Sequence, residues 1–206
     1  MQKRFARQNI VGFLVITLQL GFVSACSNWS GDGNAVSDKV ERATVSVWAP
    51  MQSQSANEVM RQQVAAFNAD QRNVQIELSL LNRSDYVKRI YQARSDHILP
   101  GIVCLDLVQF EEFAAEGVLQ PLEKMMSQRL WNDVLPDLLE QGHIGTHIYG
   151  VPAIHKPDQE LLWTVVDDAK DKSATMAFIH YLLHPERQRQ VIAAGGTQPV
   201  TYSAMP

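Results

Sequence analysis

The sequence predicts an α/β domain with a mostly parallel sheet and helices on both faces of that sheet. Some segments have alternating or unbroken apolar residues, which is typical of strands. They alternate along the chain with segments whose apolar residues recur every three or four positions, which is typical of helices. The connections between these segments are short. About 160 residues from Thr44 onward are enough for one domain with an adequate core.

Three strands are predicted in the first half of this domain. Residues 44–48 (TVSVW) and 74–80 (VQIELSL) alternate between apolar and polar side chains, so each strand turns one face toward a core. Residues 102–105 (IVCL) form an unbroken apolar run, as in a central strand covered on both faces. Apolar side chains at helical spacing predict helices over residues 56–67 and 86–93 between the strands.

The second half of the domain is predicted to contain short helices, a short extended segment over residues 147–152, a further strand and two closing helices. Residues 110–115 and 130–141 are expected to form short helices, and residues 161–166 another strand. An apolar face over residues 174–182 predicts a further helix, and Pro185 suits the first turn of the last one.

The first 25 residues have the layout of a signal peptide. Three basic residues and no acid precede an apolar run between Ile10 and Val23. The run is shorter than the ~20 residues that cross a bilayer, so a permanent transmembrane helix is the less favoured alternative. Residues 23–26 (VSAC) resemble the lipobox of bacterial lipoproteins, in which the cysteine, here Cys26, receives a diacylglycerol and becomes the new amino terminus. An ordinary secretory signal cut near Ala25 is the other alternative.

We therefore expect three parts: a lipoprotein signal peptide over residues 1–25, a polar and glycine-containing flexible tether over residues 26–43, and a single domain over residues 44–206. The protein is expected to lie outside the cytoplasm, anchored by lipid to a membrane at its periplasmic face or at the cell surface. Ser27 after the lipidated cysteine mildly favours the outer membrane of a Gram-negative cell, because an aspartate there would resemble an inner-membrane retention signal.

Charge and cysteine content exclude several function classes. The predicted mature chain has 15 Lys and Arg (18 minus 3) against 22 Asp and Glu, a net charge near −7, which argues against nucleic acid and anionic headgroups as partners. Cys104 is the one cysteine left besides Cys26, so no intramolecular disulfide is available, and its apolar neighbours predict a buried, inert thiol. No nucleophile or phosphate-loop motif appears, so neither an enzyme nor a cofactor is predicted.

Three stretches resemble the extracellular solute-binding proteins of ABC transporters, in the sugar-binding class that includes maltodextrin-binding protein. They are residues 45–77, residues 100–122 with the connector GVLQPL, and residues 148–152 (IYGVP) together with 174–200. The resemblance implies a periplasmic-binding-protein-like fold and a role in carbohydrate transport.

The chain departs from that family in length. Members have two lobes with the ligand clamped between them, but here eight residues, 153–160, separate IYGVP from a strand that resembles the return into the first lobe. We therefore expect a single-lobe version that lacks the second lobe. Because binding sites bury ~70–90% of a ligand and one lobe offers an open face, a sugar should bind weakly. Closure of two lobes is not available to it.

The resemblance places a ligand-facing edge in the loops after the strands. The candidates are Trp48, Gln52, Asp106, Gln109 and Tyr149. Aromatic faces suit sugar rings, whereas carboxylates and amides suit sugar hydroxyls. The alternatives are core packing for Trp48 and Tyr149, helix capping for Asp106, and solvated positions for Gln52 and Gln109.

Two histidine pairs have the spacing of metal ligands: His143 with His147, and His180 with His184. The first pair falls in a glycine-containing loop, and the second lacks the glutamate of a zinc protease, so no metal site is predicted.

The sequence thus predicts a lipid-anchored, substrate-binding component related to ABC-type carbohydrate transport. Its expected partners are a weakly bound small solute, in the form of a sugar, and an ABC permease or another protein. The alternative is an interaction lipoprotein that binds a protein partner through its exposed lobe surface.

Overall fold

The computed structural model describes residues 42–156, 159–195 and 198–206 of the chain, all within one compact unit. The predicted signal peptide, Cys26 and all of the predicted tether except its last two residues lie outside the described residues. None of the helices in the described part combines the length and the hydrophobicity that a membrane span needs.

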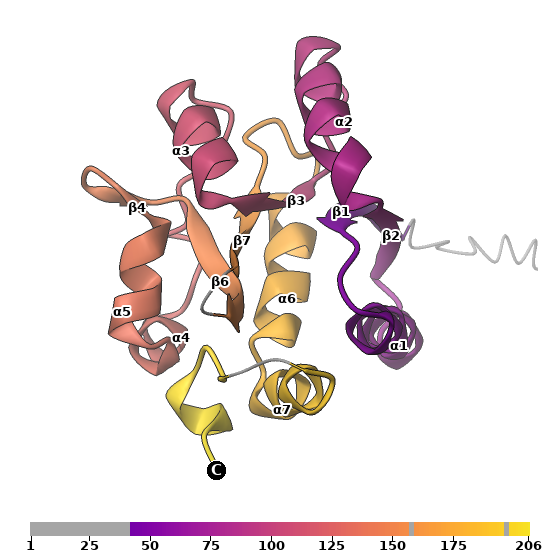
Figure 1. The fold of residues 1–206 in the computed structure, drawn as a ribbon, viewed down its shortest axis with the longest axis vertical. Helices are drawn as coiled ribbons and strands as arrows, with labels where there is room; N and C mark the ends of the chain where they lie inside the picture. The colour runs from indigo at the N-terminus through magenta and orange to yellow at the C-terminus, as the bar shows by residue number, and fades with distance from the viewer. Residues whose placement is uncertain (1–41, 157–158, 196–197) are drawn as a thin grey trace, which may run out of the picture. The chain divides into compact units, whose positions relative to one another are not determined.

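A sheet of five strands in the order β2-β1-β3-β7-β6 forms the centre (Figure 1). The strands are β1 (Ala43–Pro50), β2 (Val74–Leu81), β3 (Ile102–Asp106), β6 (Gly150–Lys156) and β7 (Gln159–Val165). β2 and β3 pair parallel with β1, whereas β7 pairs antiparallel with β3 and with β6. β7 therefore runs against the other four, and the prediction of a mostly parallel sheet is confirmed.

Helices cover both faces of the sheet, as predicted (Figure 1). They are α1 (Gln54–Asp70), α6 (Lys172–Leu182) and α7 (Pro185–Ala193) on one face, and α2 (Arg83–Ser95) and α3 (Leu107–Ala115) on the other. Phe67 and Phe178 pack with Val47 in the core of the first face. Phe110 and Phe113 belong to the core of the second face, where both are fully buried. Two separate cores, one on each side, hold the sheet.

Short elements complete the fold beside β6. They are α4 (Gln128–Asp133), α5 (Pro136–Leu139), η1 (Glu140–Gly142), the hairpin of β4 (His143–Ile144) and β5 (His147–Ile148), and the terminal η2 (Tyr202–Ala204). The carboxylate of Asp133 accepts from the backbone N of Ser203 at 2.8 Å, and Arg189 donates to the carbonyl of Ser203 at 3.0 Å. These contacts tie the end of the chain to α4 and α7.

The stretch 153–160, which the sequence suggests as a connection, is mostly strand. β6 and β7 form a hairpin whose pairing extends to Lys156 and Gln159. The chain therefore returns directly into the sheet at the point where a two-lobed protein would cross into its second lobe.

Candidate functional site

The carboxyl ends of the parallel strands meet at one edge of the sheet, which we call the carboxyl edge. β1 ends there at Pro50, β2 at Leu81 and β3 at Asp106. β6 ends at the same edge because it runs parallel to β3 across β7. In open α/β sheets, ligands bind outside this edge. Two hollows open there, one on each face of the sheet.

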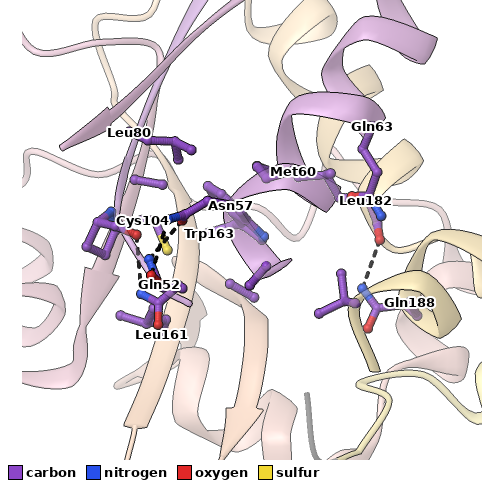
Figure 2. Close-up of a pocket in the computed structure, with 15 residues that line it drawn as sticks. Gln52, Asn57, Met60, Gln63, Leu80, Cys104, Leu161, Trp163, Leu182 and Gln188 are labelled. Atoms are coloured by element: carbon purple, nitrogen blue, oxygen red, sulfur yellow. Dashed lines mark hydrogen bonds between the residues drawn. The ribbon is translucent and has the colours of Figure 1, made fainter. Parts of the chain in front are cut away.

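The first hollow, which we call the inner cavity, lies between the sheet and helices α1, α6 and α7. Figure 2 shows Gln63, Leu182 and Gln188 on one side of it and Cys104, Leu161 and Trp163 on the other, with Met60 between them. Its volume is about 60 Å³. One water needs ~10–15 Å³, so the cavity has room for about four to six waters and is smaller than a cavity of roughly 150 Å³ that holds one benzene ring.

The amides around the inner cavity bond to the protein itself. Asn57 Oδ1 accepts from the backbone N of Gln52 at 2.8 Å, and its Nδ2 donates to the Gln52 carbonyl at 3.2 Å. Gln63 Nε2 donates to the carbonyl of Arg187 at 2.9 Å, and Gln188 Nε2 to that of Leu182 at 2.8 Å. These bonds fix α1 to the first loop and to α7, and α7 to α6, which indicates a structural role for the amides.

The second hollow, the α2/α3 groove, lies on the opposite face and measures about 650 Å³. It is lined by Pro50, Arg83, Tyr86, Val87, Cys104, Asp106, Leu107, Val108, Gln109, Glu160 and Leu161. At the far end of the two helices, Arg94 joins α2 to α3 through Glu112 at 3.2 Å and Glu116 at 2.9 Å. The helices are thus held together at one end and open to solvent at the carboxyl edge.

The floor of the groove is built from buried groups. The hydroxyl of Tyr86 donates to the carbonyls of Trp48 at 3.0 Å and Cys104 at 2.8 Å. Burial raises the pKa of Tyr86 and that of the Cys104 thiol well above their usual ranges. Cys104 is 2% exposed and is a free cysteine, so the predicted burial of its thiol is confirmed.

The walls of the groove carry opposite charges. Arg83 stands on α2, whereas Asp106 and Glu160 stand on the side of β3 and β7. No ion pair joins Arg83 to any residue in the described part of the chain. Two apolar side chains beside these charges, Val87 on α2 and Val108 on α3, are 39% and 73% exposed.

This arrangement of strands and helices is known from solved structures. The chain aligns with an extracellular solute-binding protein from Alicyclobacillus acidocaldarius at a TM-score of 0.50 and 20% identity, over 55% of this chain and 28% of that one. It aligns with the cyclic alpha-maltosyl-1,6-maltose binding protein from Arthrobacter globiformis at 0.51 and 26%, over 55% and 29%. For the sugar-binding protein MalE from Xanthomonas citri the values are 0.50 and 22%, over 54% and 28%.

The chain has the fold of one lobe of an extracellular solute-binding protein. The alignment spans less than a third of each of these solved proteins, which agrees with the predicted single lobe. No protein-family model and no curated protein matches the sequence.

Within this lobe, two of the predicted site residues lie together in the α2/α3 groove. Asp106 caps α3: its Oδ1 accepts from the backbone N of Gln109 at 3.0 Å, and its Oδ2 accepts from Gln109 Nε2 at 2.8 Å. The capping alternative for Asp106 therefore holds, but it leaves the carboxylate partly exposed at the groove. Gln109 is 6% exposed, so it supports Asp106 from within the protein and is not a solvated position.

The other three predicted site residues lie elsewhere. Gln52 lines the inner cavity. Trp48 is half-buried against the core under α2 and α3. Tyr149 precedes β6, whose first residue, Gly150, is level with the start of β3, so this ring lies at the opposite edge of the sheet from Asp106. The structure thus gathers Asp106 and Gln109 but keeps Tyr149 away from them.

The histidine pairs bond to separate partners. His143 Nδ1 lies 3.1 Å from the carbonyl of Leu139, whereas His147 Nδ1 lies 3.2 Å from the carboxylate of Glu123. His180 belongs to α6, and His184 precedes α7 as its N-cap. Across the described residues, no group of three or more His, Cys, Asp and Glu side chains is placed to hold a metal ion.

Arg83 and Glu160 are groove residues that the sequence did not single out. Arg83 directly follows Asn82, the N-cap of α2, and so stands at the mouth of the groove. Glu160 reaches the groove because β7 begins at the carboxyl edge. A charged residue directly after the cap would have been the signal for Arg83, and a charged residue directly before the predicted strand over 161–166 the signal for Glu160.

Proposed function

We propose that this chain is a lipid-anchored, extracytoplasmic solute-binding protein related to ABC-type carbohydrate transport, and that its ligand is a sugar held at the α2/α3 groove. The observation that carries the proposal is the fold of a solute-binding lobe with an open groove at its carboxyl edge. Two of the aligned solved proteins are named for maltose-type or other sugars, which supports a carbohydrate as the ligand class.

Asp106 is the residue that we assign to the sugar. An ionised carboxylate has about four acceptor sites, and Gln109 takes two of them, which leaves the others for sugar hydroxyls. The cap fixes the carboxylate in place before the ligand arrives, so little side-chain freedom is lost on binding. Because one lobe leaves much of the sugar in water, binding is expected to be weak, with a Kd on the order of 1 mM.

Isothermal titration calorimetry of residues 27–206 with maltose and maltotriose tests this assignment. The segment contains every described residue and the compact unit Lys39–Pro206. Asp106→Asn keeps a capping side chain but removes the charge, so it should weaken sugar binding about 10-fold. Asp85→Asn is the matched control, since Asp85 is exposed on α2 outside this groove. Absence of saturable heat from any sugar, or equal losses in both variants, would contradict the proposal.

The membrane anchor is a separate part of the proposal and rests on the motif VSAC at residues 23–26. Cys26→Ser should abolish incorporation of labelled palmitate and leave the unprocessed precursor, as measured by mass spectrometry of protein expressed in a bacterium. Cys104→Ser is the matched control because Cys104 is buried. Equal labelling of both variants would show that Cys26 carries no lipid.

A second candidate function is an interaction lipoprotein that binds a protein through the lobe surface. The exposed apolar side chains Val87 and Val108, placed on the two walls of one groove, favour it.

A further inference from the structure

We propose that a second copy of this chain covers the carboxyl edge, in a twofold dimer in which each α2/α3 groove faces the other. The inference rests on the proposed function only in taking this edge as the working surface. The partner is a second copy of the chain, which takes the place of the second lobe.

The charges of the groove make it complementary to itself. Arg83 lies on the α2 wall, and Asp106 and Glu160 lie on the opposite wall. In a twofold interface, residue i of one copy contacts residue j of the other and the reverse. An axis through the groove therefore sets Arg83 of each copy against the acidic wall of its partner. A partner with a single sign of charge would match one wall and be repelled by the other.

The arginine is available for this contact. Arg83 is exposed and forms no ion pair within the described residues. Arg94, on the same helix, is by contrast already paired with Glu112 and Glu116. Glu160 accepts one hydrogen bond, from Gln141 Nε2 at 2.9 Å, and an ionised carboxylate has acceptor sites beyond that one.

The exposed apolar residues, like the charges, stand on both walls of the groove. Arg83 and Val87 are four residues apart and share one face of α2. Val108 stands on the opposite wall and is 73% exposed. The same axis that joins Arg83 to the acidic wall brings Val87 of one copy toward Val108 of the other. Burying these side chains adds a hydrophobic contribution beside the charge pairs.

The net charge of the chain explains why the match must be local. Two copies with a predicted charge near −7 repel each other at long range, but salt at physiological strength screens charges beyond about 8 Å. Contacts within the groove are shorter than that. Pairing therefore depends on Arg83 meeting Glu160, and reversing one of these charges should abolish it.

Charge reversal with light scattering tests the inference on residues 27–206. The wild type should form a concentration-dependent dimer, and Arg83→Glu and Glu160→Arg should each weaken it about 10-fold or more. The double variant Arg83→Glu/Glu160→Arg should recover part of the dimer affinity relative to either single variant, because it exchanges the charges of this pair while Asp106 stays on the acidic wall. Lys88→Glu makes the same charge change on an exposed residue of α2 outside the groove and should leave the dimer intact.

Thermal melting of every variant, followed by circular dichroism, separates loss of the dimer from loss of the fold. If Arg83→Glu unfolds the chain, Arg83→Gln takes its place in the experiment. A wild type that stays monomeric at all concentrations, equal weakening by Lys88→Glu, or a double variant that does not recover each overturns the dimer. Sugar calorimetry is read independently. A dimer that binds no sugar would contradict the proposed ligand but not the dimer. A strict monomer that binds sugar would contradict the dimer but not the proposed ligand.

Discussion

The two hollows at the carboxyl edge share Pro50, Cys104 and Leu161 in their walls, yet their chemistry differs. In the inner cavity the amides bond to backbone groups of the same chain. In the α2/α3 groove, the charge of Arg83 has no ion-pair partner in the described residues, and Val108 is largely in water.

This difference distinguishes a packing defect from a surface for an outside partner. Where the polar groups of a hollow already form hydrogen bonds within the protein, they leave few donors and acceptors for a ligand. A hollow with unengaged charge and exposed apolar surface gains free energy when something covers it. By this criterion the groove, and not the better enclosed cavity, is the binding surface that we propose.

The largest expected effect compares one side chain from each hollow. Trp163 is 8% exposed beside the inner cavity, so Trp163→Ala enlarges an existing void and should lower the free energy of unfolding by about 3–5 kcal/mol. Val108→Ala in the groove should change it by less than about 0.5 kcal/mol, because that side chain is exposed. Urea denaturation of both variants measures the contrast. Similar losses in the two would show that the groove also belongs to the core.

A smaller effect is expected from the amides. Gln63 is 1% exposed and donates to the carbonyl of Arg187, so Gln63→Ala leaves that acceptor without its partner and should cost about 1–3 kcal/mol in unfolding free energy. Its neighbour Gln62 is exposed and bonds to Glu58, which makes Gln62→Ala the control, with an expected change below about 0.5 kcal/mol. If Gln63→Ala proves neutral in the same denaturation experiment, the cavity amides are not structural.

The third effect distinguishes the cap that Asp106 forms from its proposed contact with sugar. Asp106→Ala removes the cap of α3 and should lower the unfolding free energy by about 1 kcal/mol, whereas Asp106→Asn keeps the cap and should preserve stability. Thermal melts of both variants measure this, and the sugar titrations measure the other role. Equal destabilisation by both substitutions would mean that the charge, and not the cap geometry, holds α3.

The fold was largely predictable because its pattern is local. The alternation over 74–80 marks β2, which spans Val74–Leu81, and the three- and four-residue spacing in α2 places Tyr86 and Ile90 in the core, where both are buried. The strand predicted over 161–166 matches most of β7, which spans Gln159–Val165, but its pairing with β6 along residues 154–156 was not predicted. Residues 155–160 (HKPDQE) hold no apolar side chain besides Pro157 and show no alternation. The pairing of β6 with β7 depends on neighbouring strands, which the local sequence does not encode.

The site was predictable only where its residues are close in the sequence. Asp106 and Gln109 are three apart, the spacing of a cap and its partner, so their contact follows from the order of strand and helix. Arg83 and Glu160 line the same groove because two segments that are distant in the sequence reach the same edge of the sheet. Tyr149 was placed at the site by resemblance, but strand direction puts it at the other edge.

The smallest expected effect concerns the closed end of the groove. Tyr91 donates to Glu112, and this bond raises the pKa of Tyr91 to about 12 and, with Arg94, holds the pKa of Glu112 below its usual value of 4.5. A lowered carboxyl pKa adds stability above 4.5 that is lost as the pH falls through the folded-state value, and a raised phenol pKa adds stability below 10 that is lost toward 12.

Tyr91→Phe should therefore lower the Tm slightly between about pH 5 and 10, and the difference from wild type should shrink in more acidic and more alkaline buffer. Tyr202→Phe is the control, because Tyr202 is 50% exposed near the other end of the fold. A Tm difference that is constant with pH would mean that Tyr91 joins α2 to α3 through its ring contact with Phe113 and not through its hydroxyl.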